Sequence, residues 1–279
     1  KATTTQQNKN NGFNSAARLL TSLVILLGLQ GMAFGQTTQY SASGTFVAPA
    51  GVTSVVVKAW GGGGKGAGLG NGNPGGGGGS GAYAAHSSSS VSAGITYDVI
   101  VGVGGITTSN PSGTASTFNG ISAGGGSGTN SSTGGSGGTA SGGTTNTTGG
   151  SGVTVSGNDG GAGGSAPNGG VGGAGGNGPT VPGSNGSPPG GGGGGAGKNS
   201  TAFGTGARGQ VEITYTCQNY SLTSTSATNV TCPATTSTVT LSGNTVNLPV
   251  GTYTVTYSLS GANVASSTAT MTVSTAGSG

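Results

Sequence analysis

The sequence predicts an all-β protein, in which a β-sandwich scaffold carries long glycine-rich loops and a second, smaller β-sandwich follows. Three observations support this fold class. Glycine supplies 68 of the 279 residues, several-fold above its usual share of about 7%. Short runs of alternating apolar and polar residues lie between turns rich in Gly, Pro and Asn. No helical pattern is found after the N-terminal segment.

Residues 1–35 have the layout of a secretory signal peptide. Lys9 and Arg18 precede the apolar run 19–29, and small residues at Ala33 and Gly35 precede Gln36. The alternative is a membrane anchor, but this run is shorter than the roughly 20 residues that span a bilayer. We therefore expect cleavage between Gly35 and Gln36, with membrane contact only during export.

Charge is scarce, since only 4% of the residues are Asp, Glu, Lys or Arg. Removal of the leader would leave four basic residues against three acidic ones, a net charge of +1. Such a chain has no basic patch with which to neutralise phosphates, so nucleic acid is not expected as a partner.

The first predicted domain covers residues 36–216. Its expected strands are short apolar runs bounded by turn residues: 45–47, 52–57, 82–86, 96–103, 116–118 and 210–216. In the fourth run Tyr97, Val99, Val101 and Val103 share one face, which is typical of a strand.

Between these strands lie the glycine-rich tracts, of which 61–81 is the first. Residues 159–179 form unbroken triplets, and a period of three is that of a polyproline-II-type helix without internal hydrogen bonds. Fixing one residue costs about 1–2 kcal/mol, whereas one backbone hydrogen bond contributes only about 1 kcal/mol. A single tract is therefore expected to stay disordered. Order requires several tracts packed side by side as a polyglycine-II bundle, anchored by the strands.

Residues 217–279 contain less glycine and more Thr, Ser and Val. Four strands are expected, at 221–226, 237–241, 252–259 and 269–274, in a small sandwich. Cys217 and Cys232 are expected to form a disulfide in an exported protein, which would stabilise the fold by about 3 kcal/mol. The alternative is a pair of reduced, buried thiols.

The first domain resembles the glycine-rich domain of bacterial surface proteins and phage tail proteins. The likeness covers about residues 44–216 and is carried by GTFVAPAGVTSVVVKAWGGGG, GGGGGSGAYA, ITYDVIVGVGG, ASTFNGISAGGG and GARGQVEITY. The resemblance implies a β-sandwich whose loops form a polyglycine-II bundle. It also implies surface display or adhesion, and some phage members bind host receptors through these loops.

Residues 217–279 resemble an immunoglobulin-like repeat of large bacterial adhesins. GTYTVTYSLSGA and STATMTVSTAGSG carry this likeness. The repeat is expected to be truncated, with further modules of a larger surface protein after Gly279.

Residues suited to catalysis are few. His86 is the single histidine, and a Ser–His–Asp site would have to use it with Asp98. GGGGKG (61–66) matches a dinucleotide-binding motif and residues 134–138 match a nucleophile motif. Gly192–Asn199 only comes close to a P-loop, since Asn199 stands where Ser or Thr is needed. None of the three precedes a helix, which those sites require. We therefore expect no enzyme activity, no cofactor and no metal site.

Trp60 and Tyr83 allow two interpretations, as core or rim residues of the sandwich or as ligand contacts. The function expected from the sequence is an exported, non-enzymatic structural or adhesive module, secreted or at the cell surface. The alternative is a carbohydrate- or receptor-binding module that contacts surface glycans or receptors through polar loop tips and exposed aromatic residues.

Overall fold

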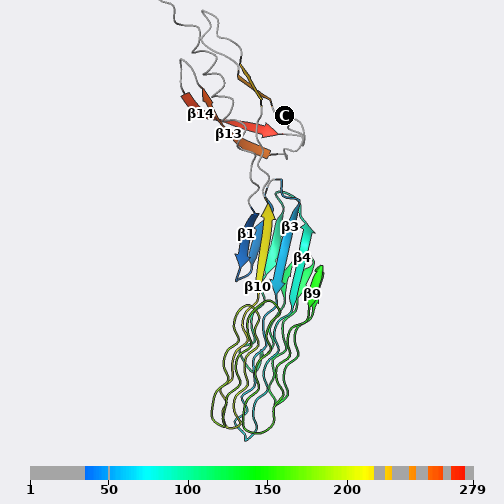
Figure 1. Cartoon of the computed structure of the whole chain (residues 1–279), viewed down its shortest axis with the longest axis vertical. Coiled ribbons are helices and arrows are strands. Elements are labelled where there is room, and N and C mark those ends of the chain that lie inside the picture. Colours follow the sequence, from blue (N-terminus) through cyan, green and yellow to red (C-terminus); the bar gives the residue numbers. More distant parts are fainter. Residues whose placement is uncertain are drawn as a thin grey trace, which may run out of the picture.

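The computed structural model describes residues 35–49 and 51–216, together with four strands nearer the C-terminus. Its described part is all-β and contains no helix, as predicted. Figure 1 shows two regions in residues 35–216, a β-sheet region and, below it, a set of long extended segments.

Two five-stranded antiparallel sheets form the β-sheet region. The first has the order β1 (Gly35–Tyr40), β10 (Gln210–Thr216), β3 (Ser54–Trp60), β4 (Tyr83–Ser90) and β9 (Thr145–Thr147). The second has the order β2 (Gly44–Val47), β5 (Thr96–Ile100), β6 (Ser116–Phe118), β7 (Ile121–Ala123) and β8 (Ala140–Ser141).

One hydrophobic cluster draws side chains from both sheets. Val57 and Ile213 of the first sheet are fully buried together with Val99 of the second. Phe46 and Phe118 meet edge to face, with ring centroids 6.0 Å apart. Alternate residues along β3 and β10 are buried, so each strand has one buried face.

Several strands follow the sequence prediction closely, since β6 and β10 have the expected bounds. The run 96–103 differs, because β5 ends at Ile100. Val103 is 46% exposed rather than buried on the expected face. Gly102, Gly104 and Gly105 allow close approach of other backbones, and the chain changes there from a two-residue to a three-residue repeat.

Four strands were not predicted, namely β1, β7, β8 and β9. The turn between β6 and β7 is a two-residue hairpin loop, Asn119–Gly120, in which both residues have positive φ. Asn-Gly is a characteristic sequence of this turn type.

Toward the C-terminus the structure describes two antiparallel pairs. β11 (Ser224–Ala227) pairs with β12 (Val239–Ser242), and β13 (Gly251–Leu259) pairs with β14 (Ala265–Val273). These strands overlap the four expected ones. Cys217, Cys232 and residues 1–34 of the leader lie outside the described residues.

Candidate functional site

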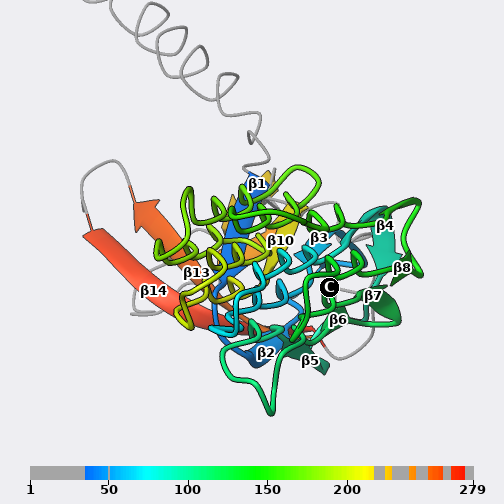
Figure 2. The same ribbon diagram turned by 90° about the horizontal axis from the view of Figure 1, so that it is seen from below.

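The most distinctive feature is a set of extended segments formed by residues 61–82, 101–115, 124–139 and 148–209, here called the glycine bundle. Each stretch continues directly from a strand or leads directly into one. Figure 2 shows these segments side by side when the molecule is seen from below. The two sheets thus fix where the segments begin and end.

Backbone hydrogen bonds join each segment to several neighbours with a repeat of three residues. Along residues 76–81 successive N–H groups donate to three segments in turn: Gly76 and Gly79 to 127–131, Gly77 and Ser80 to 150–153, Gly78 and Gly81 to 190–193. The donor–acceptor distances are 2.8–3.1 Å. A helix with three residues per turn points its N–H groups in three directions, so each segment is bonded on several sides.

Glycine is required inside the bundle because the backbones lie too close for side chains. A Cβ atom built on Gly78 would lie 2.2 Å from the Gly64 carbonyl oxygen, and one on Gly195 would lie 1.9 Å from that of Gly75. Residues 61–67 and 190–197 are buried throughout. These two glycine-rich tracts therefore lie in the interior.

The triplet repeat at 159–179 lies on the surface of the bundle. Val171 and Ala174, each first in its triplet, are exposed, whereas Gly173 and Gly176, each third, are buried. The repeat thus places its first-position residues outward and its third-position glycines against the interior. This explains why glycine occupies two positions of most triplets.

Lys65 is the exception among these interior residues. It is fully buried, and its Nζ donates to the carbonyl oxygens of Gly66 and Thr129, each at 2.9 Å. Nζ also lies 4.1 Å from the centre of the Phe203 ring, a favourable cation–π geometry. Loss of hydration lowers the pKa of Lys65 from 10.5 to about 8.

Trp60 and Tyr83 lie where the first sheet meets the bundle, and both are buried, with 5% and 7% exposed. Their rings are 5.1 Å apart and pack with Ala166, and Trp60 Nε1 donates to the Pro167 carbonyl oxygen at 3.0 Å. Both side chains are therefore packed into this junction in the described structure.

His86 and Asp98 come from different sheets, on β4 and β5 respectively. The Ser88 N–H donates to Nδ1 of His86 at 3.1 Å. That nitrogen is the one an aspartate would orient in a catalytic triad. Within the described residues no three His, Cys, Asp or Glu side chains gather as metal ligands.

The turns at the end of the bundle away from the sheets contact one another. Gly72 N–H donates to the Lys198 carbonyl oxygen, Lys198 N–H to that of Asn158, and Asn199 N–H to that of Pro179. Exposed polar side chains gather here, among them Asn71, Asn73, Asn130, Asn158, Asn177 and Asn199. We call these turns the distal tip.

Gly35 and Gln36 begin β1 and pair with Thr216 and Tyr215 of β10. The Tyr215 hydroxyl donates to Oε1 of Gln36 at 3.0 Å. Among the described residues, no helix has the length and apolar character needed to cross a membrane.

A family model described as "Glycine-rich domain" matches residues 36–216. The chain belongs to this glycine-rich domain family. The match confirms that part of the resemblance found in the sequence. A comparison with curated proteins finds no match.

The structure brings together Trp60 and Tyr83, and it brings together the glycine tracts. It places His86 and Asp98 on different sheets. Sequence reasoning missed Lys65, which it treated as an ordinary charged residue. The available signal was a lysine inside a tract, 61–68, that otherwise contains only glycine and alanine.

Proposed function

We propose that this chain is an exported, non-enzymatic structural or adhesive module of a cell-surface protein. The hydrogen-bonded glycine bundle carries the proposal. Its segments are bonded on several sides and continue from two sheets, which makes a stiff projecting element with few charges. The shared hydrophobic cluster supports arrangement of the two sheets as a β-sandwich.

The flanking segments support the same proposal. The leader-like residues 1–35 supply export, and Gln36 begins the mature chain. Residues 217–279, which resemble an immunoglobulin-like repeat in sequence, would join the glycine-rich domain to further modules of a larger surface protein.

Expression in a bacterial host tests export and display. The mature chain should begin at Gln36 by N-terminal sequencing and should be recovered outside the cytoplasm. Replacement of Leu26 by Arg within the apolar run should retain the chain in the cytoplasm, whereas Thr4→Ala should not. Recovery of uncleaved, cytoplasmic wild-type chain would contradict the export proposal.

Adhesion is tested on polystyrene beads coated with the purified chain. Coated beads should attach to bacterial or host cell surfaces more than beads coated with serum albumin. The absence of any added attachment would leave only a structural role.

The distal tip supports a second candidate function, a carbohydrate- or receptor-binding module. Asparagine side chains offer both donors and acceptors suited to sugar hydroxyl groups. Because Trp60 and Tyr83 are buried, polar groups of the tip would carry recognition. A glycan array should then show binding that is lost in the double variant Asn71→Ala, Asn73→Ala but kept in Asn119→Gly, which lies at the β6–β7 turn.

A further inference from the structure

Exposed apolar side chains form a stripe along one side of the first domain, with polar Thr45 and Asp98 between Val47 and Ile100. Val47, Ile100, Val103 and Ile106 are 46–58% exposed. Val47 and Ile100 lie on the outward face of β2 and β5, since their neighbours Phe46 and Val99 are buried. Figure 2 shows β2 and β5 together on one side of the molecule.

The stripe continues from β5 into the glycine bundle without a break. Beyond Ile100 the repeat becomes three residues, so Val103 and Ile106 face outward while Gly102, Gly104 and Gly105 are buried. Segment 101–106 therefore presents an apolar side chain once per turn, about 9 Å apart. The stripe runs parallel to the strands, along the long direction of the domain.

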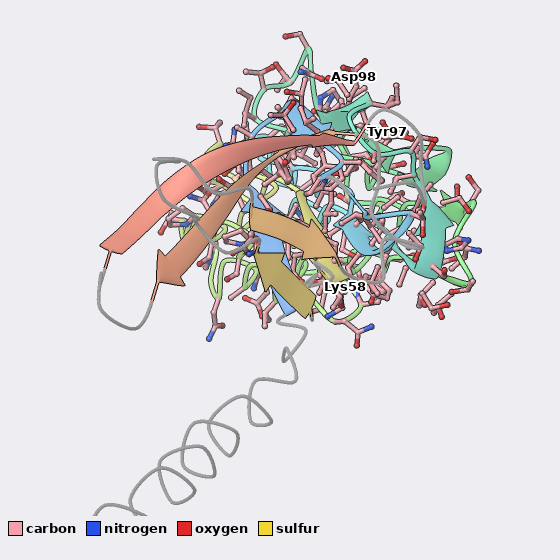
Figure 3. All side chains as sticks on the ribbon, turned by 90° about the horizontal axis from the view of Figure 1, so that it is seen from above. Lys58, Tyr97 and Asp98 are labelled. Atoms are coloured by element: carbon pink, nitrogen blue, oxygen red, sulfur yellow. The ribbon has the colours of Figure 1, made fainter. Side chains whose placement is uncertain are left out.

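Two exposed charges of opposite sign lie on either side of Ile100. Asp98 is two residues before Ile100 on the outward face of β5, and Figure 3 shows it at the outer rim, far from Lys58. Arg208 lies on the neighbouring segment next to Gly209, whose N–H donates to the Gly102 carbonyl oxygen at 2.8 Å. The exposed Arg208 side chain donates from Nη1 to the Ser41 carbonyl oxygen at 2.6 Å. Gly102 is two residues after Ile100.

This placement is self-complementary. A two-fold axis through Ile100 that makes two copies antiparallel would bring Asp98 of each copy to the level of Arg208 of the other. The same axis would place Val103 near the level of the other copy's Val47. A symmetric dimer requires that the same patch on both partners be complementary to itself. Pairing of the opposite charges favours the antiparallel arrangement of the two copies over a parallel one.

We propose that the stripe binds a second copy of this chain, in an antiparallel dimer centred on Ile100. The inference deepens the proposed adhesive function and rests on it, since antiparallel pairing joins modules that approach from opposite directions, as on two facing cells. Four half-exposed side chains make a small interface, so the dimer is weak, with a dissociation constant no tighter than about 1 µM.

Sedimentation of the purified chain over a range of concentrations tests the dimer. The double variant Val103→Ser, Ile106→Ser should weaken dimerisation at least about tenfold, because each change occurs twice in the interface. The matched control, Val153→Ser with Val171→Ser, alters residues that are at least as exposed as Val103 elsewhere on the bundle and should leave the dimer unchanged.

Charge exchange tests the register. Asp98→Arg and Arg208→Asp should each weaken the dimer, and the double variant should restore it, which nonspecific apolar association would not do. The proposal would be overturned by a chain that stays monomeric at all concentrations. It would also be overturned if these substitutions left the dissociation constant of the dimer unchanged.

Coated beads separate this inference from the adhesive function. Clustering of coated beads with one another, lost in Val103→Ser, Ile106→Ser, supports the dimer as an adhesive contact. Beads that attach to cells but not to one another overturn homotypic binding and leave adhesion standing. Beads that do neither contradict both.

Discussion

Lys65 lies fully buried in the glycine bundle, where its ammonium group has lost most of its hydration. Two carbonyl oxygens and the Phe203 ring replace part of that hydration. The pKa of Lys65 is consequently about 8, below its ordinary value of 10.5. The folded state therefore releases this proton at a lower pH than the unfolded state.

The stability of the chain should rise with pH between about 8 and 10.5. In this range the unfolded chain binds more protons than the folded one, so removing protons favours folding. Lys65→Met should remove this dependence, whereas Lys58→Met, at a half-exposed residue, should keep it. Urea unfolding at a series of pH values measures the effect, and a flat wild-type profile would contradict it.

Glycines differ in how much space surrounds them. Gly78→Ala should destabilise the fold by about 3 kcal/mol or more, because its Cβ would overlap the Gly64 carbonyl. Gly44→Ala is the matched control, since the nearest atom would be 3.7 Å away, on the Tyr40 ring. Thermal unfolding of both variants makes the comparison. Equal melting temperatures would argue against close packing in the bundle.

At the scale of elements, each bundle segment is a continuation of a strand. Residues 61–67 follow β3 and residues 203–209 lead into β10. The strands hold the segments in register, and hydrogen bonds to several neighbours hold them along their length. An interior segment such as 190–197 should thus be as protected as a central strand, although it contains almost no side chains.

Hydrogen exchange tests this expectation. The amides of Gly193 and Gly194, which donate to Gly64 and Ser184 at 2.8 Å, should exchange as slowly as those of β3. Thr201, exposed at the distal tip, serves as the unprotected reference. Exchange of the 190–197 amides as fast as that of Thr201 would refute an ordered bundle.

For residues 35–216 as a whole, the sheets and the bundle depend on one another. The β-sheet region contributes most of the buried apolar side chains, and the bundle contributes backbone hydrogen bonds. Isolated glycine segments could not recover the entropy lost on ordering. We therefore expect one cooperative unfolding transition.

Val57→Ala tests the coupling. It removes two methyl groups from the fully buried core of the sheets and should cost about 2 kcal/mol. The slowest amides of the bundle, including Gly194, should lose protection by the same free energy. Ser54→Ala, at an exposed residue of the same strand, is the control. Unchanged protection of Gly194 would mean that the bundle unfolds separately.

The sequence alone determined the all-β class, the strands with strong alternation and the need for packed glycine tracts. The strand Gln210–Thr216 could be predicted from its own residues, because apolar and polar side chains alternate along it when one face of a strand is buried. The triplets at 159–179 likewise predicted a three-residue repeat. The Asn119–Gly120 hairpin could have been found from its turn residues.

Only the tertiary structure decided which segments are neighbours. Glycine has no side chain that could select a neighbouring segment. The hydrogen bonding of residues 76–81 to three other segments therefore cannot be derived from the amino-acid sequence. The same holds for the end of β5 at Ile100, the burial of Trp60 and Lys65, and the stripe that Val103 and Ile106 complete. These features depend on the close approach of backbones that are distant in sequence.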